Sequence, residues 1–159
     1  MDINERNDIC CPQLRAIDGV NPMDESFVYA RSAGITCVCT GPGSANVLGG
    51  TFTAIKTAGT RIDDMIVKKE AAMKCAFGEN PKRCYASKCD SSRMTTAAIL
   101  REALMKARLY LQKKEAAGDD VFRQPAFDMK LEALIPVLRG QIPLKAHAHR
   151  ADDIFTAIR

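Results

Sequence analysis

The alternation of apolar and polar positions along the chain predicts short strands separated by helices. Residues 35–40 form a continuous run rich in β-branched side chains, which is typical of a strand buried on both faces of a parallel sheet. Residues 51–56 alternate in the manner of a second strand, and residues 68–76 fit either a strand or a helix. Residues 142–149 predict a further strand near the end of the sequence.

Apolar residues at helical spacing predict four helices, over residues 24–34, 92–118, 128–140 and 152–159. The longest carries an apolar stripe made of Ala98, Leu100, Ala103, Leu104, Ala107 and Leu111. We expect Pro136 to kink or shorten the third helix, because proline removes a backbone donor and clashes with the preceding turn.

Two segments between these elements read as loops with a functional character. Residues 41–50 contain four glycines, and residues 77–83 combine glycine, proline and charged side chains. The order strand, loop, helix, strand predicts an α/β domain around a parallel sheet, without an internal repeat or linker. The glycine loop lacks the lysine of a phosphate-binding loop and the Gly-x-Gly-x-x-Gly pattern, so we do not expect a nucleotide site.

The composition narrows the class of protein. The chain has 159 residues, of which 47% are hydrophobic and 26% charged, which excludes a disordered or low-complexity chain and is sufficient for one core. The net charge of +4 is not gathered into a basic stripe with interleaved aromatic residues, so a nucleic-acid partner is not expected. A membrane span needs roughly 20 consecutive apolar residues, and the sequence has no such stretch.

The sequence has seven cysteines, and an odd number cannot pair fully within one chain. The polar residues 1–6 do not resemble a signal peptide, so we expect a cytoplasmic, reducing environment with free thiols. The pairs Cys37-x-Cys39 and Cys84-x4-Cys89 raise the alternative of a small cysteine–zinc protein. Because Cys37 and Cys39 lie in a β-branched run, we instead expect them to face the core.

Three side chains are candidates for chemistry on spacing alone. His147 and His149 are two apart on one predicted strand, so both would point to the same face, and imidazole is the commonest zinc ligand in proteins. The alternative is that these are ordinary core or surface histidines. Glu79 would bind a metal or act as a general base, or else is a turn residue that pairs with Lys82 or Arg83.

Taken together, five segments resemble the amidohydrolase superfamily, most closely its imidazolonepropionase-related branch. The segments are residues 14–22, 33–36, 41–47, 76–82 and 147–154. Their order and spacing fit along nearly the whole chain, which makes the match more specific than any single motif.

The resemblance implies a metal-dependent hydrolase on a (β/α)8 barrel, with zinc or another divalent transition metal at the C-terminal ends of the strands. It implies that a metal-bound hydroxide attacks an amide or cyclic amide C–N bond of a small-molecule substrate. By this resemblance His147 is the strand-five ligand, and His149 lies behind it or contacts substrate. Glu79 is the bridging acidic ligand, with a carboxylated Lys74 as the alternative.

The same resemblance implies a partial α/β (β/α)8 barrel, covering about strands two to five as one domain, residues 1–159, truncated at both ends. The strand-one histidine pair would lie upstream, and the strand-six histidine and strand-eight aspartate downstream. Because a full barrel needs ~250 residues, we expect weak zinc binding and little or no hydrolysis by this chain alone. The alternative is a non-catalytic half-barrel that binds a partner or oligomerises through its exposed barrel edges.

Overall fold

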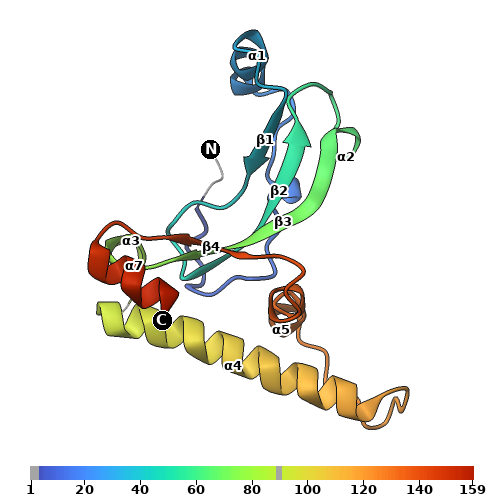
Figure 1. Cartoon of the computed structure of the whole chain (residues 1–159), viewed down its shortest axis with the longest axis vertical. Helices are drawn as coiled ribbons and strands as arrows, with labels where there is room; N and C mark the ends of the chain where they lie inside the picture. Colours follow the sequence, from blue (N-terminus) through green and yellow to red (C-terminus); the bar gives the residue numbers. More distant parts are fainter. Residues whose placement is uncertain (1–3, 89–90) are drawn as a thin grey trace.

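Four strands form a single curved sheet whose spatial order follows the chain, as the computed structural model of the protein shows (Figure 1). The structure describes residues 4–88 and 91–159. The strands are β1 (Cys37–Thr40), β2 (Leu48–Lys56), β3 (Ile66–Ala76) and β4 (Leu144–His147). The pairs β1–β2 and β2–β3 are antiparallel, whereas β3–β4 is parallel. Only the last pair therefore has the strand direction that the sequence predicts for the whole sheet.

Helices occupy the connections, with the largest one between the two parallel strands. They are η1 (Ala16–Asp18), α1 (Glu25–Ser32), α2 (Ile62–Met65), α3 (Glu79–Tyr85), α4 (Arg93–Ala117), α5 (Met129–Glu132), α6 (Ile135–Leu138) and α7 (Ala151–Ile158). A parallel pair needs a crossover connection, and α4 to α6 supply it. None of the described helices combines the length and the apolar character that crossing a membrane requires.

The predicted helix boundaries are confirmed where capping residues mark them. The Asp24 carboxylate accepts a hydrogen bond from the Ser26 amide at the start of α1, and Ser92 forms a capping box with Thr95 at the start of α4. Pro136 interrupts the third predicted helix, as expected: the segment divides into α5 and α6, with the proline in the first turn of α6, where its missing N–H does no harm.

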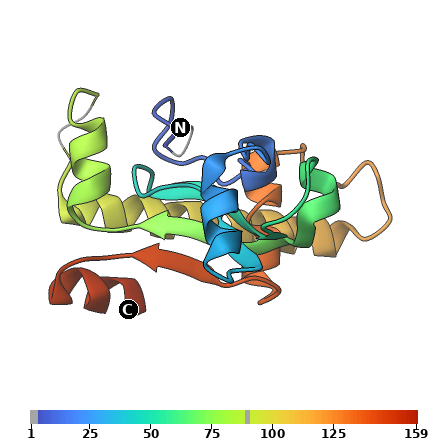
Figure 2. The ribbon, with the colours of Figure 1, turned by 90° about the horizontal axis from the view of Figure 1, so that it is seen from above.

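Helix α4 covers one face of the sheet, and the main core lies between them. Figure 2 shows β4 beside β3, with α7 turning back next to the end of β4. The buried residues of this core are Val47, Leu48, Met73, Cys75, Phe77, Leu100, Ala107, Leu134 and Ile142. Strand alternation places Met73 and Cys75 on the covered face and leaves Lys74, between them, on the opposite one.

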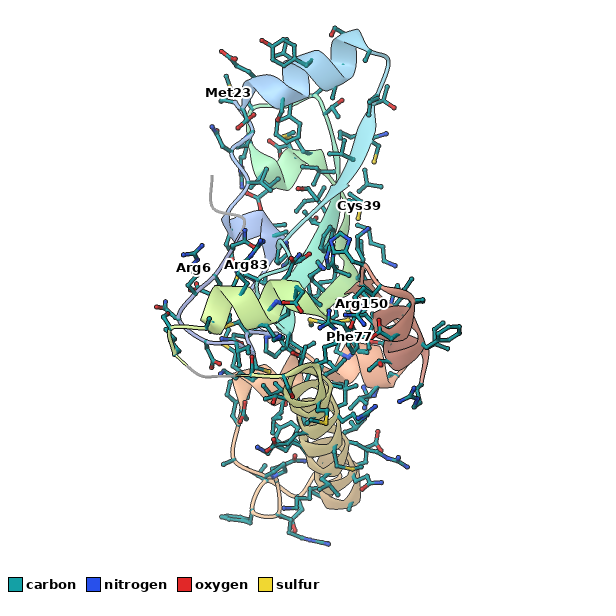
Figure 3. The ribbon with its side chains drawn as sticks, turned by 90° about the vertical axis from the view of Figure 1, so that its left-hand side faces the viewer. Arg6, Met23, Cys39, Phe77, Arg83 and Arg150 are labelled. Carbon is teal, nitrogen blue, oxygen red and sulfur yellow. The ribbon has the colours of Figure 1, made fainter. Side chains whose placement is uncertain are left out.

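The first strand does not have the environment that its sequence suggests. We expected residues 35–40 to be buried on both faces of a parallel sheet, but β1 is an antiparallel edge strand of alternating exposed and half-buried residues. Cys37 and Cys39 are both exposed, so the prediction that they face a core is wrong. Figure 3 shows Cys39 at the outer margin of the sheet. A β-branched run suits any pleated surface, so it does not distinguish an edge strand from a central one.

Both predicted loops are shorter than expected because regular structure extends into them. Strand β2 starts at Leu48, so Gly49 and Gly50 belong to it rather than to the glycine loop. Gly50 has a φ of +100°, and a Cβ there would lie 2.3 Å from the carbonyl oxygen of Leu14. The second loop is largely helix α3, which begins one residue after Gly78.

A polar cluster joins the N-terminal segment to the glycine loop and to α3. The Asn46 side-chain amide donates to the Tyr85 hydroxyl at 2.9 Å and to the Asp8 carbonyl at 2.8 Å, and the Tyr85 hydroxyl also donates to that carbonyl at 2.6 Å. Burial raises the pKa of Tyr85 to about 12, so its hydroxyl remains a donor at neutral pH. The remainder of the glycine loop is thereby held in place by hydrogen bonds.

We predict that Met73→Ala lowers the free energy of unfolding by about 2–5 kcal/mol, because Met73 is fully buried between β3 and α4 and its loss leaves a cavity. Met94→Ala is the matched control, since Met94 is 80% exposed on α4 and its truncation removes almost no buried surface. Urea unfolding followed by circular dichroism measures both. Equal losses in the two variants would contradict the assigned core.

Candidate functional site

The candidate site lies where β3 and β4 end, on the face of the sheet opposite α4. The register pairs Lys74 with Lys145 and Ala76 with His147, and directly paired residues point to the same face. The Lys145 ammonium lies 5.0 Å from the centroid of the Phe52 ring of β2, which places that ring on the same face. Parallel strands end at the same edge of a sheet, so the side chains of β3 and β4 converge there.

His147, the last residue of β4, contacts two side chains near the strand ends. Its Nε2 lies 3.0 Å from the side-chain amide nitrogen of Asn80, and its ring centroid is 4.5 Å from that of His149 in an edge-to-face arrangement. Burial, the charge of Lys74 and the neighbouring His149 lower the pKa of His147, with burial the largest cause. The ring is therefore held neutral near pH 7, as metal ligation or proton acceptance requires.

Lys74 is an almost fully buried amine on the same face. The residue is only 5% exposed, and its Nζ donates a hydrogen bond to the Cys75 carbonyl at 2.9 Å. Burial is the main cause that lowers the pKa of Lys74 to about 8; the charge of Lys145 adds to it, and Cys75 opposes it. At pH 7 about a tenth of this amine is neutral, far more than in an ordinary surface lysine, which gives it more nucleophilic character.

The partners of Glu79 are basic side chains and not the two histidines. Its exposed carboxylate accepts from Arg93 Nη1 at 2.7 Å and lies 3.5 Å from Lys82 Nζ. These contacts, with Arg93 the largest cause, lower the pKa of Glu79. The structure pairs Glu79 with Lys82, as one interpretation of the sequence has it, and adds Arg93 as the partner at the shorter distance.

Asn80, Arg93 and Asp153 are the residues of this region that the sequence analysis missed. Asn80 follows Glu79 directly and contacts His147, and Arg93 joins Glu79 to the buried Asp153. The available signals were indirect: Asn80 lies inside the segment that resembles the amidohydrolases, and the run Asp152-Asp153 lies in the first turn of a helix. Figure 3 marks the borders of the region with Phe77, directly after β3, and Arg150, directly before α7.

A cavity of about 450 Å³ opens between the N-terminal segment, η1 and the glycine loop. Gly49 and Pro42 form part of its wall, and Arg15 and Asp18 supply charge at its rim. Lys74 lies near this part of the wall, because a Cβ added at Gly49 would come within 3.6 Å of Lys74 Cγ. The volume is in the range of small-molecule sites.

The donor set fits a metal ion only in part. Two imidazoles and a buried amine lie at the ends of β3 and β4, but the described residues contain no group of three or more His, Cys, Asp or Glu side chains that would hold a metal. Glu79, the predicted acidic ligand, is engaged with Arg93 instead. His147, together with Lys74 if it is modified, would supply some of the ligands of a metal centre and not a closed coordination sphere.

Two known proteins are similar to this chain over almost its whole length. The crystal structure of an amidohydrolase from Thermotoga maritima MSB8 matches 99% of the chain and 42% of its own, with a TM-score of 0.94 and 44% sequence identity. The chain is related to amidohydrolases. A second relative, Amidohydrolase tasK from Hapsidospora irregularis, is 31% identical over 174 residues, which are 96% of this chain and 18% of its own length. No protein-family model matches.

These relationships agree with the amidohydrolase resemblance of the sequence, and the mixed α/β fold with its curved four-stranded sheet is consistent with part of a barrel. The chain spans less than half the length of either amidohydrolase relative. What the structure adds is the placement of the side chains, with His147 and Lys74 together and Glu79 engaged elsewhere.

We predict that the stability of the protein rises with pH through the titration of Lys74. Its folded pKa lies below the ordinary value, so between about pH 8 and 10.5 the unfolded state binds more protons than the folded state. Lys74→Met should therefore be more stable than the wild type at pH 7, by on the order of 2 kcal/mol, with the difference shrinking towards pH 10. Urea midpoints measured under reducing conditions test this.

The matched control for Lys74 is Lys69→Met, which removes an exposed lysine from the same strand. Its difference from the wild type should not vary with pH over this range. A constant difference for Lys74→Met as well would refute the assigned environment of the amine.

Proposed function

We propose that the chain forms part of a metal-dependent hydrolase of the imidazolonepropionase-related branch, which acts on amide or cyclic amide C–N bonds of small molecules. In this proposal the parallel pair β3–β4 would belong to a (β/α)8 barrel. Strands β1 and β2 run antiparallel, so the sheet as a whole does not match the four consecutive barrel strands, about two to five, that the resemblance implies. The observation that carries it is the convergence of Lys74, His147 and His149 at the C-terminal ends of β3 and β4. Barrel enzymes place their active sites at that end of the strands.

His147 is the proposed metal ligand from β4, since burial and its neighbours keep the ring neutral. Lys74 is the proposed second contributor: its buried amine, held beside the cavity wall, would become an oxygen ligand after carboxylation. Glu79 is the weaker candidate, because its carboxylate is paired with Arg93 and Lys82. A bound zinc ion would supply Lewis-acid activation of water in such a site.

His149 is proposed to contact substrate or to orient His147. It is exposed, and its ring meets that of His147 edge to face. The cavity beside Gly49 is the proposed entry for the small-molecule substrate, because Lys74 lies close to the part of its wall that Gly49 forms. A reducing compartment is proposed from the cysteines, of which the six in the described residues are free thiols.

We predict that the chain binds zinc weakly and that His147→Ala reduces the affinity at least tenfold, because the variant removes the imidazole at the end of β4. Glu79→Gln should leave the affinity unchanged, since its carboxylate is engaged by Arg93. Competition with a chromophoric zinc chelator measures all three proteins. Equal affinities of His147→Ala and the wild type, or loss of binding in Glu79→Gln alone, would reverse the assignment.

We also predict that the isolated chain does not hydrolyse amide or cyclic amide substrates, with or without added zinc. The described residues bring two imidazoles and an amine to the strand ends but do not assemble a metal-binding group of three or more His, Cys, Asp or Glu side chains. Product release from a panel of such substrates is the measurement. Zinc-dependent turnover that His147→Ala abolishes would show that the chain is a sufficient catalyst.

The second candidate function is a half-barrel that binds a partner or assembles with copies of itself through its edges. Helix α7 favours it, because Ile154, Phe155 and Ile158 are exposed by 45%, 64% and 76% respectively, next to the outer edge of β4. Neighbouring apolar side chains of this size are typical of a covered surface. This candidate accounts for the exposed apolar side chains of α7, whereas the hydrolase proposal accounts for the polar side chains at the strand ends.

A further inference from the structure

Arg93, the first residue of α4, forms ion pairs with carboxylates of two other helices. Its Nη1 lies 2.7 Å from Glu79 Oε1 on α3, and its Nε lies 2.9 Å from Asp153 Oδ1 on α7. Helices α3 and α7 directly follow the ends of β3 and β4. One guanidinium group therefore connects the two segments that leave the strand ends with the long helix beneath the sheet.

The Asp153 end of this network is buried and closely packed. The side chain of Asp153 is only 5% exposed, against 58% for Glu79. Gly78, with a φ of +75°, lies against it, and a Cβ at Gly78 would be 2.4 Å from Asp153 Oδ2. The carboxylate thus supports the backbone of the residue before Glu79, while Arg93 holds the Glu79 side chain.

The turn held in this way carries Asn80 to His147. The side-chain nitrogen of Asn80 lies 3.0 Å from Nε2 of His147, and the Phe77 amide donates to the His147 carbonyl at 2.9 Å. An amide nitrogen is a donor only, so Nε2 is the acceptor and a neutral ring carries its proton on Nδ1. Free histidine prefers the opposite, Nε2–H, form, so the Asn80 contact would impose the less common tautomer.

We propose that Arg93 is a positioning residue. By pairing with both Glu79 and Asp153, it fixes the segment of residues 78–80. Asn80 at the end of this segment then keeps the His147 ring in the Nδ1–H tautomer. The role of the ring as a functional group rests on the proposed function, whereas the ion pairs and the Asn80 contact do not. A metal ion bound to Nε2 would take the place of the Asn80 amide there, and the Nδ1–H tautomer is the one that leaves Nε2 available to it. The planar guanidinium presents several donors in fixed directions, and lysine, a single point charge, would not hold both carboxylates in the same geometry.

The test is the tautomer of His147 in chain labelled with 15N-histidine. Long-range 1H–15N spectra, recorded at one pH where both rings are neutral, distinguish a protonated from an unprotonated Nε2. The chain has only two histidines, so His149→Gln assigns the signals and His149 serves as an internal reference. The wild type should show His147 as Nδ1–H, and Asn80→Ala should convert it to mainly Nε2–H.

Arg93→Met should convert His147 to mainly Nε2–H, and Arg93→Lys should give a mixture of the two forms. Because Arg93→Met leaves the buried Asp153 unpaired and risks unfolding, Glu79→Ala is the second variant: it removes the exposed half of the network and retains the Arg93–Asp153 pair. We expect it to raise the Nε2–H fraction. Arg139→Gln, which removes an exposed Arg–Glu pair formed with the C-terminal part of α4, is the matched control and should change nothing.

The proposal is overturned if His147 of the wild type is Nε2–H, or if the folded Arg93 and Glu79 variants retain the wild-type tautomer. Should Arg93→Met and Arg93→Lys fail to fold, an unchanged tautomer in Glu79→Ala is sufficient to overturn it. Zinc binding separates this inference from the proposed function. A tautomer shift in a chain that does not bind zinc supports the positioning role and refutes the metal site, and zinc binding with an unshifted tautomer does the reverse.

Discussion

The parallel pairing of β3 with β4 is the constraint on which the rest of the structure depends. These strands are separated in sequence by residues 77–143, so their pairing closes a long loop and must offset its entropy. The offset comes from α4, which packs its buried residues on Met73 and Cys75. The pairing in turn fixes the relative position of Lys74 and His147, so the energy of the core determines the geometry of the site.

Two buried ionisable groups lie near the end of β3. One is Lys74, on the face of the sheet opposite α4, and the other is Asp153, which packs against Gly78 just after the strand. Asp153 is compensated by Arg93, as a buried carboxylate requires. Lys74 donates to a carbonyl, and none of the ion pairs among the described residues includes it. Because no counter-charge offsets the desolvation of its ammonium group, the pKa of Lys74 is lowered instead. Of the two, the lysine is the group left available for chemistry.

Local signals in the sequence predicted the helices better than the strands. Ser92 and the apolar stripe after it are sufficient to define α4, because a helix is made of contacts between near neighbours. The direction and burial of β1 depend on its pairing with β2, which strand composition does not encode, and Cys37 was misplaced for this reason. Glu79 and Asn80 are adjacent, but on a helix neighbouring side chains diverge, and only the fold shows which one meets His147.

The incomplete donor set and the uncovered apolar surface occur at the same place. His147 ends β4, the edge strand whose outer side is unpaired within the described sheet, and α7 exposes Phe155 and Ile158 next to that edge. A strand–helix unit added there would pair with β4, cover α7, and bring its own strand end beside His147, because parallel strands end together. An exposed apolar surface thus lies at the edge through which further ligands would reach the site. Both the hydrolase and the assembly interpretation therefore require that another structural unit pairs with the outer edge of β4. They differ in whether that unit also brings metal ligands to the strand ends.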